Sequence, residues 1–228
     1  MSYFTRTQNP ILTILLPSRN RFDMCKSTIN SFLDKCNNKN NIQVILKFDT
    51  DDISSIERIS ELPSDIKLNT IISDRKQGYH SLHEYCNEML EYAVGDWVLF
   101  MNDDSTMETK DWDIILENAS PTGSFGGSKD LALLNPKGQI EFPFVRTSIC
   151  KKLGYFALHN HVDSFLQDIY VKLNARTNVN IDISHKRDLM TDRTRMETAA
   201  AAQLTSPTYG PFIKNNYEKI ASELKRYL

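Results

Sequence analysis

Two acidic segments of the sequence each follow an apolar stretch at the point where that stretch ends. The Asn-Asp-Asp segment at 102–104 comes after the apolar residues 97–101, and the acidic segment 49–52 comes after 42–48. Carboxylate and amide oxygens are the ligands that hard divalent cations such as Mg²⁺ and Mn²⁺ prefer. The same residue types also favour solvated turns and helix N-caps, whatever the function. Because each segment ends a predicted buried strand, we favour a ligand-binding role for both.

The first two-thirds of the sequence alternates apolar runs with segments of helical spacing, which is typical of a sheet with crossover helices. Continuous apolar runs form strands that are covered on both faces. In an open α/β sheet, ligands bind at the carboxyl ends of the strands, which is where the acidic segments lie. We expect strands at 11–16, 42–48, 67–72 and 97–101, and helices around 25–36 and 82–93 between them.

Beyond the fourth predicted strand the periodicity is weaker. Residues 179–183 alternate like a half-buried strand that ends at His185. The tail at 213–224 has helical spacing and is expected to pack on the body of the protein. The sequence shows no internal repeat or low-complexity segment. We therefore predict one domain at 1–190 with a helical C-terminal extension at 191–228.

Composition limits the partners that the protein can have. The chain of 228 residues is 40% hydrophobic, which is enough for a sizeable core. Its 27 basic and 29 acidic residues give no general attraction to nucleic acid or to anionic membranes. No run approaches the ~20 apolar residues of a membrane span, which leaves only peripheral membrane attachment open. Four widely spaced cysteines do not form a disulfide pattern and indicate a reducing compartment, so we expect a cytoplasmic protein. The oligomeric state is not indicated.

Four segments, in this order, resemble the GT-A glycosyltransferases, in particular the inverting enzymes of family 2. Residues 15–21 resemble the strand-Pro-x-x-Asn-Arg start of that family, and 48–52 resemble its second acidic strand end. Residues 93–104 resemble the run into its DxD motif, and 153–164 resemble its acceptor-side turn and catalytic acid. The resemblance implies an α/β GT-A fold, which is Rossmann-like with a mostly parallel central sheet flanked by helices. It also implies inverting transfer of a sugar from a nucleoside diphosphate sugar to an acceptor hydroxyl of a glycan or saccharide.

The resemblance further implies a metal site. In GT-A enzymes a divalent cation, Mn²⁺ or Mg²⁺, is held between the protein and the two phosphates of the donor, where it acts as a Lewis acid. The first acid of the DxD motif is Asn102 in this chain, so Asp104 is expected to be the principal metal ligand. His185 resembles the C-terminal histidine that completes the metal shell in many of these enzymes.

The remaining site residues are assigned from the same resemblance. An inverting transfer needs one general base to accept the proton of the acceptor hydroxyl, and Asp163, at the start of a helix expected at 162–174, is the candidate. Asp163 would otherwise be an ordinary helix cap, just as at least one of Asp51 and Asp52 is expected to cap the helix that follows. Arg19 and Arg75, which are expected to bind the donor, would otherwise be plain surface residues. The expected donor-binding residues are Pro17, Arg19, Asn20, Asp49, Asp51, Arg75, Asn102 and Asp103.

Three alternatives stay open. A nucleotidyltransferase has a similar α/β architecture, although its usual glycine-rich phosphate loop has no counterpart at 17–21. The missing acid at Asn102 also permits a non-catalytic, sugar-binding module. The HxHxD segment 159–163 resembles the zinc motif of metallo-β-lactamase-type hydrolases, but Ser164 stands where that family has another histidine, so we rank this reading well below a transferase.

Overall fold

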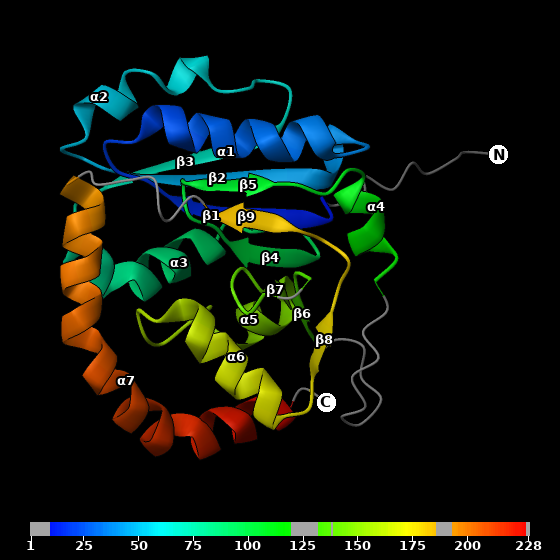
Figure 1. Cartoon of the computed structure of the whole chain (residues 1–228), viewed down its shortest axis with the longest axis vertical. Helices are drawn as coiled ribbons and strands as arrows, with labels where there is room; N and C mark the ends of the chain where they lie inside the picture. The colour runs from blue at the N-terminus through cyan, green and yellow to red at the C-terminus, as the bar shows by residue number, and fades with distance from the viewer. Residues whose placement is uncertain (1–9, 120–131, 138, 186–192, 227–228) are drawn as a thin grey trace.

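A seven-stranded sheet forms the centre of the protein (Figure 1). The structure is a computed structural model, and it describes residues 10–119, 132–137, 139–185 and 193–226. Within these residues the strand order of the sheet is β3-β2-β1-β4-β7-β6-β8. The strands are β1 (Leu12–Pro17), β2 (Ile42–Asp49), β3 (Lys67–Ser73), β4 (Trp97–Phe100), β6 (Leu133–Asn135), β7 (Phe144–Arg146) and β8 (Arg176–Asn178).

The sheet is parallel on one side and mixed on the other. β1 pairs in parallel with both β2 and β4, so that Leu12 lies opposite Ile42 on one side and Trp97 on the other. β7 runs antiparallel to β4 and β6, and β8 runs parallel to β6. The four predicted strands are confirmed, and so is the expected α/β fold with a mostly parallel central sheet.

A separate two-stranded sheet positions the C-terminal histidine of the predicted site. β5 (Ser105–Met107) follows directly after the acidic segment 102–104, and β9 (Ile183–His185) pairs with it in antiparallel orientation. In this register Ser105 lies opposite His185. The pairing therefore brings His185 beside the carboxyl end of β4, although the two lie far apart in the sequence.

Helices cover both faces of the large sheet (Figure 1). One face packs against α1 and α4, and the opposite face packs against α3, α5, α6 and the end of α7. Side chains of β1 alternate between the two layers: Ile14 and Leu16 belong to the first core and Leu15 to the second. The helices are α1 (Phe22–Lys35), η1 (Lys39–Asn41), α2 (Ile53–Ile56), η2 (Ile59–Glu61), η3 (Gly78–Ser81), α3 (Leu82–Leu90), α4 (Trp112–Glu117), α5 (Thr147–Leu153), α6 (Val162–Lys172) and α7 (Arg193–Lys225).

The last helix, α7, is bent along its length (Figure 1). Pro207 and Pro211 lie inside it, and an internal proline removes a backbone hydrogen bond and kinks a helix. Its C-terminal part packs on the body through the buried Ile220 and Leu224, as expected from the spacing at 213–224. Across the described residues, no helix combines the length and the apolar character that are needed to cross a membrane.

One predicted strand is wrong in most of its length. Residues 179–182 are not part of a strand, and only Ile183 to His185 pair as β9. The buried Val179, Ile181 and Ile183 instead pack in the core on the α1 side of the sheet. The alternation in the sequence therefore reflects side-chain burial of an extended segment that makes only isolated backbone hydrogen bonds, from Val179 N–H to Asn135 O at 2.8 Å and from Lys137 N–H to Ile181 O at 2.7 Å, and no continuous strand ladder.

Gly95 allows a close contact between the turn before β4 and the start of β1. A Cβ atom at this position would lie 2.6 Å from the backbone nitrogen of Thr13 and 2.9 Å from its Oγ1. We predict that Gly95→Ala lowers the free energy of unfolding by about 1–3 kcal/mol, as overpacking does, measured by urea denaturation. Gly210→Ala is the matched control, because no atom lies within 4 Å of a Cβ there, and it should raise stability by roughly 0.5–1 kcal/mol. An unchanged unfolding midpoint for Gly95→Ala would contradict the prediction.

Candidate functional site

A cavity of about 1060 Å³ opens at the carboxyl ends of β1, β2 and β4. Its other walls come from the turn after β3, from the start of α6 and from the first half of α7. Two of the eleven predicted site residues, Asn20 and Asp51, lie outside its lining. The nine that line it are Pro17, Arg19, Asp49, Arg75, Asn102, Asp103, Asp104, Asp163 and His185.

The two predicted metal ligands face each other in this cavity. His185 Nε2 lies 2.8 Å from Asp104 Oδ1, and both side chains are largely buried. The side-chain nitrogen of Asn102 lies 3.4 Å from His185 Nε2, and Glu141 lies 3.5 Å from His185 Nδ1. A carboxylate, an imidazole and an amide are a donor set that suits Mn²⁺, and Mg²⁺ accepts the oxygens. Across the described residues no group of three or more His, Cys, Asp or Glu side chains forms a metal cluster.

The orientation of His185 is set by packing as well as by pairing. The ring of Phe142 meets the imidazole edge-on at a centroid distance of 5.5 Å. Phe142 has φ of 57°, which is the left-handed region that bulky residues rarely adopt. Such strained conformations cluster at functional sites because the surrounding structure must hold them in place.

Asp103 lines the cavity, but its carboxylate is engaged by the protein. Ser18 Oγ donates to Asp103 Oδ2 at 2.7 Å, and Arg21 Nη1 donates to Asp103 Oδ1 at 3.1 Å. Burial raises the pKa of Asp103, although Arg21 and Ser18 oppose this shift. Thr28 Oγ1 lies 2.8 Å from the carbonyl oxygens of both Asp103 and Ser105, and its single proton is shared between these two acceptors. These contacts fix the end of β4 against α1, and so they hold Asp104 at the cavity wall.

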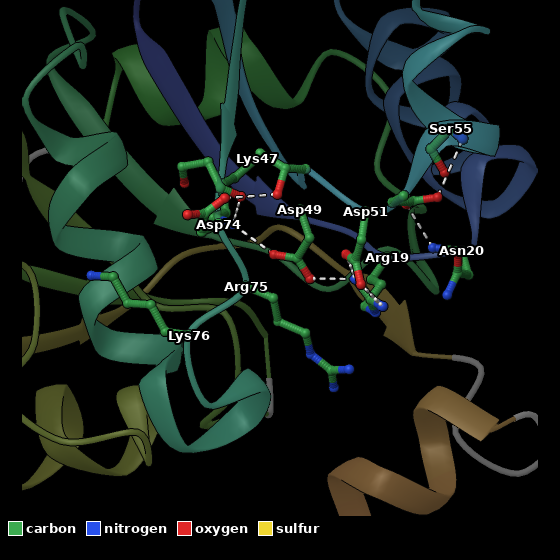
Figure 2. A network of polar contacts seen from close by, with 12 residues as sticks. Arg19, Asn20, Lys47, Asp49, Asp51, Ser55, Asp74, Arg75 and Lys76 are labelled. Atoms are coloured by element: carbon green, nitrogen blue, oxygen red, sulfur yellow. Dashed lines mark hydrogen bonds and ion pairs between the residues drawn. The ribbon is translucent and has the colours of Figure 1, made fainter.

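The end of β2 carries a chain of ion pairs (Figure 2). Lys47 Nζ donates to Asp49 Oδ1 at 2.7 Å, and Arg19 Nη1 donates to Asp49 Oδ2 at 2.9 Å. Arg19 also binds Asp51 through both terminal nitrogens, one of them at 2.7 Å. The hydrogen bonds from Arg19 lower the pKa of Asp51. Asp51 thus anchors Arg19 from outside the cavity. Asp49, by contrast, is one of the residues that line the cavity.

A hydrogen bond between Asn20 and Asp52 shapes the turn after β1. Asn20 has φ of 55°, and its backbone N–H donates to Asp52 Oδ2 at 2.8 Å. The side chain of Asp52 also accepts from the backbone N–H of Ser55 at 3.3 Å, which caps α2. The expectation that one aspartate of this segment is a helix cap is confirmed for Asp52.

Arg75 reaches the cavity from the turn after β3. Its Nη2 donates to Glu197 Oε2 of α7 at 2.7 Å. Gly78 permits this arrangement, since a Cβ on Gly78 would lie 3.1 Å from Arg75 Nη2. The positive φ of Gly78, 56°, is also a conformation that favours glycine. Arg75 therefore links the strand-end side of the cavity to α7.

Asp163 is the second residue of α6 and lies on the cavity wall. The loop that leads to α6 is held by Asn87 of α3, whose Oδ1 accepts from the backbone N–H groups of Phe156 at 2.7 Å and Ala157 at 3.1 Å. Carboxylates are stabilised in the first turn of a helix by its dipole. The position suits a group that must be charged in order to accept a proton.

The histidines of the HxHxD segment pack against α7. The rings of His159 and His161 stack at a centroid distance of 5.4 Å, and each contacts the ring of Tyr209. Burial lowers the pKa of His159 to about 4 and also lowers that of His161, so these rings are neutral at physiological pH. Tyr209 in turn donates to Asp168 of α6 at 2.6 Å. The segment thus joins α6 to the bent part of α7.

Several residues that contact the predicted ones were not themselves predicted, among them Glu141, Glu197 and Lys47. Glu141 beside His185 and Glu197 beside Arg75 carry no local sequence signal, because each meets its partner only in the folded chain. Lys47, by contrast, does carry a local sequence signal. It is the only charged residue in the apolar run 42–48, and it lies two positions before Asp49, which places both side chains on the same face of β2.

Comparisons with known proteins agree with this architecture. The sequence model described as Glycosyl transferase family 2 matches residues 13–128. No curated protein matches the sequence. Among solved structures, S. aureus TarS 1-349 is 14% identical, with 87% of this chain and 73% of that chain covered and a TM-score of 0.57.

Two further structures extend the likeness. The mannosyltransferase PcManGT from Pyrobaculum calidifontis, in complex with GDP-Man and Mn²⁺, is 10% identical, with 96% and 85% of the chains covered and a TM-score of 0.57. The glucosyl-3-phosphoglycerate synthase from Mycobacterium tuberculosis, in complex with Mn²⁺, UDP and phosphoglyceric acid, is 14% identical, with 86% and 78% covered and a TM-score of 0.51. This chain spans only 57% of the TarS chain that is in complex with UDP. Since the family match at residues 13–128 covers just over half of the sequence, the chain belongs to glycosyl transferase family 2, and its mostly parallel sheet flanked by helices is the GT-A fold that the similar structures share.

Proposed function

We propose that this protein transfers a sugar from a nucleoside diphosphate sugar to a hydroxyl group of a saccharide acceptor, with inversion and with the help of a divalent cation. The observation that carries the proposal is one cavity that holds the Asp104–His185 pair, at 2.8 Å, together with Asp163. The family membership and the metal and nucleotide complexes of the similar structures support it.

Asp104 and His185 would hold Mn²⁺ or Mg²⁺, with Asn102 beside them. A bound cation supplies Lewis-acid stabilisation of the negative charge that grows on the diphosphate leaving group. Arg75 adds a further positive charge to the cavity lining. Its guanidinium now binds Glu197, and a diphosphate would compete with that carboxylate for the same donors.

Asp163 would act as the general base. In a single displacement the acceptor hydroxyl attacks the anomeric carbon as the bond to the diphosphate breaks, and its proton passes to a carboxylate. The start of α6 presents Asp163 to the same cavity that the ends of β1 and β2 line, where the rest of the donor would bind. On this assignment Pro17, Arg19 and Asp49 contact the nucleoside part.

We assign the catalytic domain to residues 1–190 and treat 191–228 as an extension that completes the site. Support comes from α7, whose Glu197, Ala201 and Tyr209 line the cavity. The same helix is anchored in the core at its other end by Ile220 and Leu224. Catalysis on this view requires α7 to stay in place.

A thermal-shift screen of UDP-, GDP- and dTDP-sugars, each with and without Mn²⁺, tests the function. A ligand at 100 times its Kd stabilises the folded state by about 2.7 kcal/mol, which corresponds to a rise in Tm of roughly 5–10 °C for a domain of this size. We expect such a rise for at least one donor, larger with Mn²⁺ than without, and slow hydrolysis or transfer of the same donor. Absence of binding and of turnover across the whole panel would rule out the proposal, and binding without turnover would favour a sugar-binding module.

A further inference from the structure

Lys47 is a buried charge in the middle of the protein. Only 1% of its side chain is exposed, and its neighbours Leu46 and Phe48 in β2 are fully buried. Lysine is almost never fully buried unless it is paired, because the loss of hydration around the ammonium group is costly. A packing role would be served at lower cost by an apolar residue such as methionine. The charge of Lys47 therefore calls for a specific explanation.

The ammonium group of Lys47 makes one ion pair and two weaker contacts. Its Nζ donates to Asp49 Oδ1 at 2.7 Å and lies 3.4 Å from the carbonyl oxygen of Ser73 in β3. The ammonium also lies over the ring of Tyr85 from α3, 4.3 Å from its centroid. These three contacts hold the ammonium in a fixed position beneath Asp49.

Asp49 is thereby held from both sides (Figure 2). One oxygen accepts from Lys47, and the other accepts from Arg19, which Asp51 anchors in turn. A carboxylate oxygen has about two acceptor sites, so each oxygen of Asp49 keeps capacity for a further donor. Lys47, Arg19 and Asp49 all line the cavity. The result is a carboxylate of fixed orientation at the end of the cavity assigned to the nucleoside.

We propose that Lys47 is a positioning residue that sets nucleotide specificity by fixing Asp49 as an acceptor for a ring N–H of the donor base. The inference rests on the proposed function. Uracil, thymine and guanine carry such an N–H on the edge that pairs in nucleic acids, whereas cytosine and adenine present a bare ring nitrogen there. A bare nitrogen facing a fixed carboxylate places two acceptors together and leaves both without a donor. A hydrogen bond to a charged group corresponds to a preference of about 10- to 100-fold.

Calorimetric titration of the full chain with UDP, GDP and CDP, each with Mn²⁺, tests the proposal. The wild type should bind UDP or GDP at least about tenfold more tightly than CDP. Lys47→Met keeps the length of the side chain but removes the charge, and it should reduce this preference about tenfold while the affinity for CDP changes little. Lys47→Arg restores a cation and should retain most of the preference. Lys39→Met is the matched control, because it removes an exposed lysine whose ion pair with Asp65 lies outside the cavity.

The readout separates positioning from simple stabilisation. A lysine that only stabilised the fold would, when replaced, lower Tm and weaken all three nucleotides equally, and that result would overturn the inference. An equal affinity of the wild type for CDP and for the other two nucleotides would also overturn it. If Lys47→Met does not fold, Asp49→Asn tests the same contact from its other partner and should cause the same loss of preference. Failure of the wild type to bind any nucleotide would overturn the proposed function itself, and this inference with it.

Discussion

Asp163→Asn should lower the rate of sugar transfer about 10²- to 10⁴-fold and leave binding of the donor within about threefold of the wild type. The amide has nearly the same shape as the carboxylate, but it cannot accept the proton of the acceptor hydroxyl. Asp163 lies in the first turn of α6 and not at the Asp104–His185 pair, so the metal and the diphosphate should bind as before. Turnover with a donor identified by thermal shift, and the affinity of the same donor by calorimetry, measure the two effects.

Asp34→Asn is the control for this prediction. It makes the same chemical change on the exposed face of α1, and it should leave both transfer and binding unaltered. If Asp163→Asn retains wild-type turnover, the base is another residue. A parallel loss of donor binding would instead indicate that Asp163 organises the donor site.

The central strands β1, β2 and β4 were predictable from sequence because they are buried on both faces. A run such as 42–48 has to be apolar nearly throughout when helices cover both sides, and this signal is local. The alternation at 179–183 was misleading because it does not by itself distinguish a strand from an extended segment without strand pairing. Val179 and Ile181 are buried by packing against the core, and alternation alone does not tell whether a neighbouring strand supplies the pairing.

The site was predictable to the extent that it is built from strand ends. Asp49 is the last residue of β2 and Asp104 follows β4, so the parallel sheet itself brings them to one edge. The partners from the later part of the chain depend on long-range pairing. His185 reaches Asp104 because β9 pairs with β5, and only a family resemblance indicated it. Glu197 meets Arg75 across 122 positions, and no pattern in the sequence predicts that contact.

Metal-dependent nucleotide binding should be lost in Asp104→Asn. Asp104 supplies the carboxylate of the Asp104–His185 pair, and its loss should weaken Mn²⁺-dependent binding about a hundredfold, which corresponds to about 3 kcal/mol. We expect calorimetry to show that Mn²⁺ strengthens the binding of UDP or GDP to the wild type. The same titrations of Asp104→Asn should show weak binding that Mn²⁺ no longer improves.

Asp113→Asn distinguishes loss of the metal site from loss of structure. Asp113 is a buried aspartate outside the cavity, and its carboxylate accepts from the backbone N–H groups of Asn37 at 2.8 Å and Asn38 at 3.0 Å. Its replacement should lower stability by about 1–3 kcal/mol and leave the response to Mn²⁺ unchanged. The opposite pattern is expected for Asp104→Asn, in which the Mn²⁺ response disappears while the protein stays folded. Retention of Mn²⁺-dependent binding by a folded Asp104→Asn would place the metal elsewhere and would leave the buried pair with His185 as a structural contact.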